Sequence, residues 1–205
     1  MKPIRLISGF LTVGFWTLAS RILGMVREIL LFSLIGAGPL LDAFFAAFRL
    51  PNMFRRFFAE GAFNSAFVPL ISKKYERKEN ATAFANEAMG SLAFILLTLT
   101  TFAIIFMPAV IWAIANGFVG DERFEITVAF GRVMFPYILL ISLAALLSGV
   151  LNALGYFAAA AAAPVLLNIT IIFGLCISFF FEWPTITILI YSVPFAGILQ
   201  LILLW

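Results

Sequence analysis

The sequence contains no histidine, a single cysteine and few charged residues. Of its 205 residues, 11% are Asp, Glu, Lys or Arg, where about 25% is usual for a soluble domain. The absence of histidine excludes a histidine-based catalytic triad and a His-ligated zinc site, and one cysteine excludes a disulfide framework. The 13 Lys and Arg exceed the 10 Asp and Glu by three, too few for a nucleic-acid footprint. Most soluble enzyme classes are therefore excluded, and no cofactor, metal or nucleic-acid partner is expected.

Apolar residues make up 64% of the chain, against roughly 45–50% in an ordinary soluble domain. A soluble globule of this size could not hide so many apolar side chains, because polar groups must still cover its surface. Six runs are long enough for the ~20 residues of a spanning helix. They cover about residues 7–35, 40–72, 83–115, 126–151, 160–181 and 185–205. The sequence therefore predicts an all-α polytopic membrane protein with about six transmembrane helices.

Turn and breaker residues separate these runs, as in residues 36–39, 73–80 and 182–184. Prolines also lie inside the runs, where they remove a backbone donor and bend a helix: Pro51, Pro69, Pro108, Pro136 and Pro194. Pro51, followed by Asn52, is expected to break the helix of the second run. Several helices should be kinked, as they often are in transporters that alternate access.

The basic residues outside the runs predict the orientation. If the N-terminus is cytoplasmic, the following all lie inside: Lys2, Arg5, Lys73, Lys74, Arg77 and Lys78. Only Arg123 then lies in an outside loop, which obeys the positive-inside rule. An alternative interpretation takes residues 2–20 as a signal peptide. Because the apolar run resumes after Glu28 and completes the charge pattern, we expect the first segment to be retained.

The last run ends at Trp205 with no polar tail or basic flank. A complete membrane protein normally finishes in water. We therefore expect residues 1–205 to be the N-terminal transmembrane lobe of something longer, or a truncated reading frame, whose natural partners include the missing remainder and the membrane lipids.

Charged residues inside the runs are the most informative, because each costs at least ~2.5–3.5 kcal/mol at a helix centre on insertion scales. The first run carries Arg21, Arg27 and Glu28, and the second carries Asp42, Arg49, Arg55, Arg56 and Glu60. The two runs should lie near each other because their linking turn is short. Internal salt bridges or snorkelling side chains are one interpretation. A polar, water-filled cavity is favoured for the four arginines Arg21, Arg27, Arg55 and Arg56.

Helical phase groups some of these charges. On an uninterrupted helix, Asp42, Arg49, Arg56 and Glu60 point within about 40° of one another. Guanidinium stays charged in any environment and binds phosphate through paired donors, so an arginine-rich cavity in a membrane indicates an anionic cargo such as a phosphate or pyrophosphate headgroup. Asp42 and Glu60 would position the arginines, or repel them as the cavity changes shape.

Four stretches carry a resemblance to a known family: ASRILGMVREILL, GAGPLLDAFFAAFRLPNMFRRFFAEGAFNSAFVPL, FPYILLISLAALLSGVLNALGYF and APVLLNI. They closely resemble the N-terminal portion of the MurJ (MviN) family of lipid II flippases, in the multidrug/oligosaccharidyl-lipid/polysaccharide exporter superfamily. The resemblance implies a two-lobe transporter of about fourteen helices, of which this chain is the first lobe. It also implies that the family's important positions fall on Arg21, Arg27, Asp42, Arg55 and Glu60.

The function implied by the resemblance is translocation of undecaprenyl-pyrophosphate-linked disaccharide pentapeptide, lipid II, across the bacterial cytoplasmic membrane during peptidoglycan synthesis. Transport would run from the cytoplasmic to the periplasmic leaflet by alternating access. Two alternatives stay open. One is another exporter of the superfamily, carrying a different polyprenyl-linked glycan or a drug. The other is an integral-membrane enzyme or partner protein using Asp42 or Glu60, which the lack of His and of an aspartate-rich cluster disfavours.

Overall fold

The protein is described here by a computed structural model, which gives the backbone of residues 3–60, 62–77 and 80–205. Within these ranges, side chains are described except for residues 3–10, 55–60, 62–65 and 76. The described chain is almost entirely helical. Its elements are α1 (Pro3–Leu34), α2 (Pro39–Glu60), α3 (Ala62–Glu76), α4 (Ala81–Ile105), α5 (Met107–Ile114), the 3-10 turn η1 (Asn116–Phe118), α6 (Glu122–Met134), α7 (Tyr137–Ala153), α8 (Phe157–Phe180) and α9 (Thr185–Leu204).

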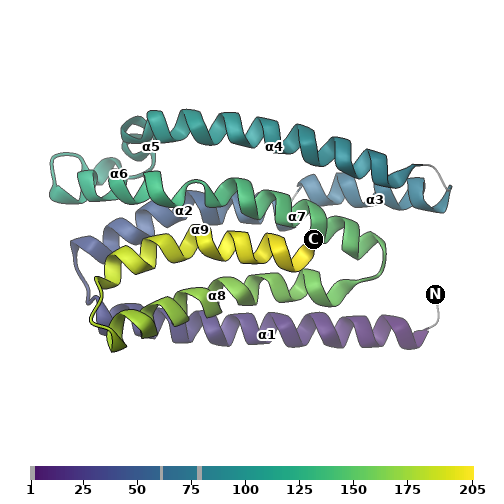
Figure 1. The fold of residues 1–205 in the computed structure, drawn as a ribbon, viewed down its shortest axis with the longest axis horizontal. Coiled ribbons are helices and arrows are strands. Elements are labelled where there is room, and N and C mark those ends of the chain that lie inside the picture. Colours follow the sequence, from purple (N-terminus) through teal and green to yellow (C-terminus); the bar gives the residue numbers. More distant parts are fainter. Residues whose placement is uncertain (1–2, 61, 78–79) are drawn as a thin grey trace.

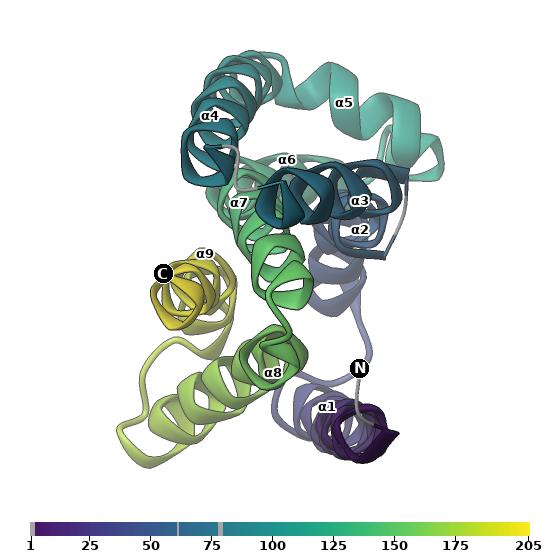
Figure 2. The same ribbon diagram turned by 90° about the vertical axis from the view of Figure 1, so that its right-hand side faces the viewer.

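The long helices lie roughly along one axis (Figure 1). Helix α1 packs along α8, which also packs against α9, while α2 packs against α6 and α7. Viewed end-on, α1 and α8 lie on one side of the molecule and α4 and α5 on the other, with α7 between (Figure 2). The first two runs were expected to lie near each other, but α1 makes its extensive packing contacts with α8. Beyond their short turn, α1 and α2 diverge (Figure 2).

Three of the six predicted runs each contain two helices. The second run holds α2 and α3, the third holds α4 and α5, and the fourth holds α6 and α7. The third run breaks at Phe106, and Pro108 follows at the start of α5, where a missing backbone N–H costs nothing. The fourth run breaks at Phe135 and Pro136, between two helices that differ in direction by 41°.

The expectation that Pro51 breaks its helix was wrong. Pro51 is buried inside α2, which continues without interruption to Glu60. A proline removes one hydrogen bond and crowds the preceding turn, and the bonds on either side can still carry the helix past it. Pro69 and Pro194 also lie inside helices, α3 and α9.

Three helices in the described chain are long and apolar enough to cross a membrane: α4, α8 and α9. The bent pair of α6 and α7 meets the same test as a single span. These four spans correspond to the last four predicted runs. The remaining two predicted runs, which contain α1 and α2, are those that carry the charges of residues 21–60.

The helices bury apolar side chains in two clusters. One includes Tyr137, Ile171 and Leu189 and joins α1, α2, α6, α7, α8 and α9. The other includes Met107 and Ile138, where α3, α4 and α5 meet α6 and α7. A fully buried glutamine, Gln200, donates a hydrogen bond to the carbonyl of Ala163 at 2.7 Å and accepts one from the Tyr137 hydroxyl at 3.2 Å. The last three helices are therefore tied together by polar as well as apolar contacts.

Candidate functional site: a polar cavity containing Arg27

A small polar cavity lies between α1, α2 and α8. It has a volume of about 180 Å³. Its lining consists of Ser20, Gly24 and Arg27 from α1, Phe48 and Asn52 from α2, and Pro164, Leu167 and Asn168 from α8. On α1 and α2 these residues are spaced three or four apart, and on α8 Leu167 and Asn168 follow Pro164 by three and four residues, so each set lies on one face of its helix. Side chains from all three helices enclose the cavity; in the end-on view, α1 and α2 diverge and α8 lies beside α1 (Figure 2).

Arg27 provides the charge in this cavity. Only 16% of its side chain is exposed, and its Nη1 donates a hydrogen bond to Oδ1 of Asn168 at 3.0 Å. Its Nη2 lies 3.4 Å from Oε1 of Glu28, whose side chain is 58% exposed. A partly buried guanidinium needs such partners, because removing its charge from water is costly.

Asn168 is itself fixed by the opposite helix. Its Nδ2 donates to the backbone carbonyl of Ser20 at 2.9 Å and lies 3.4 Å from the Ser20 hydroxyl oxygen. The side chain is 6% exposed. Gly24 lies beside it, and a Cβ there would be 3.8 Å from Nδ2 of Asn168. Asn168 therefore links α8 to α1 through both its amide nitrogen and its amide oxygen. The hydrogen bond to Ser20 fixes the orientation of the amide, and hence the oxygen that accepts the hydrogen bond from Arg27.

Asp42 lies elsewhere, in the first turn of α2, where its Oδ2 is 3.4 Å from Nη1 of Arg123 on α6. Arg123 is held more closely by Asp121, with Nη2 and Nε at 2.6 and 2.8 Å from the same carboxylate oxygen. Its guanidinium carbon lies 4.5 Å from the centre of the Phe118 ring. Asp121 also caps α6 by accepting from the Arg123 backbone N–H. These hydrogen bonds lower the pKa of Asp121, because they favour its charged form.

The remaining predicted site residues divide into two groups. The side chains of Arg55, Arg56 and Glu60 lie outside the described residues. Arg21 is exposed on α1 and is not part of the described cavity lining. The predicted stripe on α2 is therefore described only at Asp42 and Arg49, both of which are exposed.

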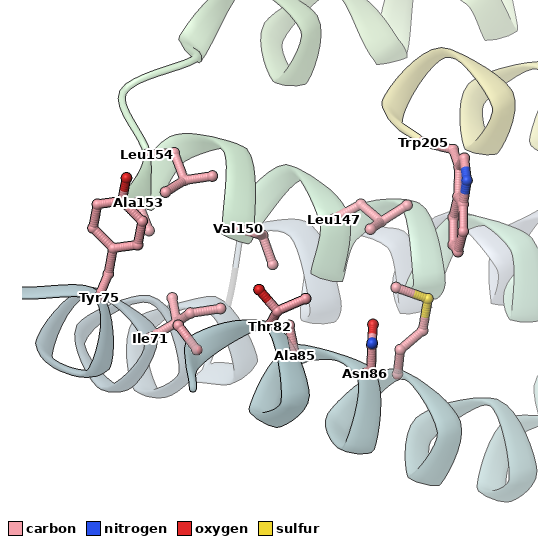
Figure 3. Close-up of a pocket in the computed structure, with 12 residues that line it drawn as sticks. Ile71, Tyr75, Thr82, Ala85, Asn86, Leu147, Val150, Ala153, Leu154 and Trp205 are labelled. Atoms are coloured by element: carbon pink, nitrogen blue, oxygen red, sulfur yellow. The ribbon is translucent and has the colours of Figure 1, made fainter. Parts of the chain in front are cut away.

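A second and larger cavity, of about 260 Å³, lies between α3, α4, α7 and the chain end (Figure 3). Ile71, Leu147 and Val150 line it together with Trp205, and Thr82 and Asn86 add polar atoms. No charged side chain is among its described lining residues. In the parts of the chain with described side chains, no three His, Cys, Asp or Glu residues gather as a metal site would require. The cavity around Arg27 is the better candidate for binding an anion.

Sequence reasoning missed Ser20 and Asn168, two polar residues of the cavity lining. Ser20 and Asn168 are small uncharged residues in apolar runs, and Asn168 is 141 residues distant from Arg27. The only available signal was the position of an amide side chain in the middle of an apolar run, where an unpaired polar group is costly.

The sequence and the fold of this chain are both similar to those of known proteins. The family model for "Lipid II flippase MurJ" matches residues 31–205. A probable lipid II flippase MurJ of Rhizobium tropici is 47% identical over 96% of this chain and 38% of its own length. The lipid II flippase MurJ of Burkholderia cenocepacia is 40% identical over 96% of this chain and 39% of its own length. A solved structure, "Lipid II flippase MurJ, inward closed conformation", superposes with a TM-score of 0.79 at 29% identity, covering 93% of this chain and 40% of that one.

The helices, several of them long and apolar enough to cross a membrane, define an all-α polytopic membrane protein. Its helices match those of a solved flippase, and its sequence matches the family model over more than half of its length. The chain belongs to the MurJ family of lipid II flippases. It spans about two fifths of the length of the curated relatives it matches.

Proposed function

We propose that this chain is the N-terminal transmembrane lobe of a lipid II flippase. In this proposal it takes part in moving undecaprenyl-pyrophosphate-linked peptidoglycan precursor from the cytoplasmic to the periplasmic leaflet of the bacterial inner membrane. The lobe acts with a second, C-terminal lobe by alternating access, as a transporter and not as an enzyme. Its N-terminus is cytoplasmic, as the distribution of Lys and Arg predicts.

The observation that carries the proposal is Arg27, a guanidinium held within the body of a membrane protein by Asn168. An arginine in this setting is functional by default, because a charge removed from water is retained only at a cost. Guanidinium matches the oxygens of a pyrophosphate with paired donors and stays charged there. Arg27 would therefore bind the pyrophosphate, while Arg21, Arg55, Arg56, Asp42 and Glu60 would complete or regulate the polar path.

The size of the cavity supports a binding site that this lobe forms together with a second lobe. At about 180 Å³, it is smaller than the ~300–1,000 Å³ of typical ligand pockets. It would thus form one wall around the pyrophosphate, with the sugars, peptide and lipid tail contacting the second lobe and the membrane. The proposal also agrees with the two-fifths coverage of the relatives.

A chimaeric flippase tests the proposal. The 205-residue chain replaces the matching part of the Rhizobium tropici relative, and the chimaera is expressed in a strain depleted of its own flippase. We expect the native chimaera to prevent lysis and Arg27→Ala to abolish rescue. Arg27→Lys should rescue weakly, because an ammonium keeps the charge but loses the paired donors.

Arg132→Ala is the matched control, because Arg132 is an exposed arginine on α6 outside the described cavity lining. All variants are compared at equal membrane abundance. Full rescue by Arg27→Ala would refute the assignment of Arg27. A native chimaera that leaves lysis unchanged, but restores capsule export or drug resistance in strains lacking those exporters, would instead identify another exporter of the superfamily.

A further inference from the structure

Arg123 stands at the same end of the molecule as the turn between α1 and α2. It belongs to the first turn of α6, and Asp42 belongs to the first turn of α2. These helices also pack against each other. The two residues are 81 positions apart in sequence, and their side chains meet at 3.4 Å. The ion pair therefore links two helices that have no short connection.

The contacts of Arg123 are unequal. Asp121 binds it at 2.6 and 2.8 Å, and the Phe118 ring lies against its guanidinium at 4.5 Å. Asp121 and Phe118 both belong to the segment directly before α6, so they fix Arg123 to its own helix. The contact with Asp42 is longer, and the Asp42 side chain is 53% exposed. Arg123 is thus the fixed member of the pair and Asp42 is the member that is positioned.

Helix α2 transmits this position to the cavity. Phe48 and Asn52, which line the cavity, follow Asp42 by six and ten residues on the same helix. At about 1.5 Å per residue, Asn52 lies only ~15 Å along the axis from Asp42. The buried side chain of Phe48 stacks on Phe44 at 5.7 Å and lies 6.3 Å from Tyr137, so displacement of α2 would also alter its packing on α7.

We propose that Arg123 is a positioning residue for transport: through Asp42 it sets the place of α2, and hence the α2 wall of the cavity that contains Arg27. The proposal rests on the proposed function for its transport consequence. An exposed ion pair contributes little to overall stability. Arg123 therefore acts on the geometry of the cavity more than on the survival of the fold.

Transport by the chimaera described above gives the first test. Arg123→Ala should reduce rescue by about fivefold or more, the lower end of usual coupling between sites. Reversing the pair with Arg123→Asp and Asp42→Arg should restore part of the loss, which independent roles for the two residues would not predict. Glu122→Ala is the matched control, because Glu122 is the exposed neighbour in the same turn of α6. Native-like rescue by Arg123→Ala, or a reversed pair no better than Arg123→Ala alone, would overturn the proposal.

A distance measurement separates this proposal from the flippase assignment. Spin labels are placed at two exposed positions, Met53 on α2 and Ala129 on α6, in the 205-residue chain in lipid nanodiscs with Cys176→Ser. Arg123→Ala should broaden or lengthen the distance distribution, and the reversed pair should narrow it again. If the native chimaera fails to rescue, the flippase assignment fails while this measurement still decides the role of Arg123. An unchanged distribution in Arg123→Ala overturns that role.

Discussion

Asn168 accepts a hydrogen bond from Arg27 at 3.0 Å and is held in place by the backbone of the helix that carries Arg27. The amide thus gives the guanidinium a neutral partner. A carboxylate at the same place would pair with the charge that the proposed pyrophosphate requires. The neutral amide fixes the direction of Arg27 without neutralising it, while the carboxylate of Glu28 lies farther away, 3.4 Å from Nη2, and is 58% exposed.

Asn168→Ala removes the acceptor for Arg27 and the donor to Ser20. We expect rescue by the chimaera to fall about as far as in Arg27→Ala, and the unfolding free energy to fall by about 1–3 kcal/mol because buried polar groups lose their partner. Asn168→Asp should also fail, because its charge competes with the pyrophosphate. Thr170→Val is the control, since among the described residues the Thr170 hydroxyl donates its hydrogen bond within α8, to the Leu166 carbonyl. Normal rescue by both Asn168 variants would contradict the positioning of Arg27.

Gly24 tests how closely α1 and α8 must approach at the cavity. A Cβ on Gly24 would lie 3.8 Å from Asn168 Nδ2, which is ordinary van der Waals contact. Gly24→Ala should therefore retain rescue, with a small gain in stability from the better helix propensity of alanine. Gly24→Leu should displace Asn168 and reduce rescue. Thermal unfolding of the purified chain distinguishes displacement of Asn168 from misfolding of the whole chain. Native rescue by Gly24→Leu would show that α1 and α8 need not approach closely at Gly24.

Gly174 allows α8 to contact α9 closely. A Cβ there would lie 2.5 Å from the Ser192 hydroxyl oxygen and 3.1 Å from Cγ2 of Ile188. Gly174→Ala should destabilise the chain by about 1–3 kcal/mol, because an overpacked core strains its neighbours. Adding Ser192→Ala should recover part of that loss by removing the nearest atom. Thermal unfolding in one detergent compares the single and double variants, and no recovery in the double variant would show that the clash lies elsewhere.

Asp121 predicts a dependence of stability on pH. Arg123 lowers its pKa from the ordinary value of 3.8 through hydrogen bonds. A carboxylate whose pKa is lower in the folded state stabilises the fold above its unfolded pKa, and this contribution is lost as the pH falls through the folded value. The temperature of the unfolding midpoint should therefore decrease as the pH is lowered below about 4. The decrease should be smaller in Asp121→Asn, which has no carboxylate at this position to protonate. If the unfolding midpoint of the native chain and that of Asp121→Asn change equally between pH 6 and pH 3, the Asp121 carboxylate does not stabilise the fold.

The helical class and some of the element boundaries could be predicted from local sequence. The first, fifth and sixth predicted runs lie close to the observed bounds of α1, α8 and α9. Pro51 was less predictable, because whether a proline breaks a helix depends on what packs around it, and here it is buried within α2. The break at Phe106 also lacked a unique signal, since several apolar residues precede Pro108.

The candidate site was predictable in part. Arg27 was identified because a charge in an apolar run is costly wherever the run packs. Its partner could not be identified, because Asn168 looks like any polar residue on α8 until α8 is placed against α1. Asp42 was expected in an arginine stripe on its own helix, whereas it meets Arg123 of α6. Helical phase predicts which residues share a face but does not predict which helix that face will meet.

The sequence by itself determined that the chain is a helical membrane protein, and it identified the charged residues inside apolar runs that need polar partners or a function. These properties follow from the local cost of exposing polar groups to hydrocarbon. Only the tertiary structure decided that α1 packs on α8, that Arg27 meets Asn168, and that Asp42 meets Arg123. Many helix pairings satisfy the same apolar pattern, and the choice among them depends on close packing between surfaces far apart in the sequence.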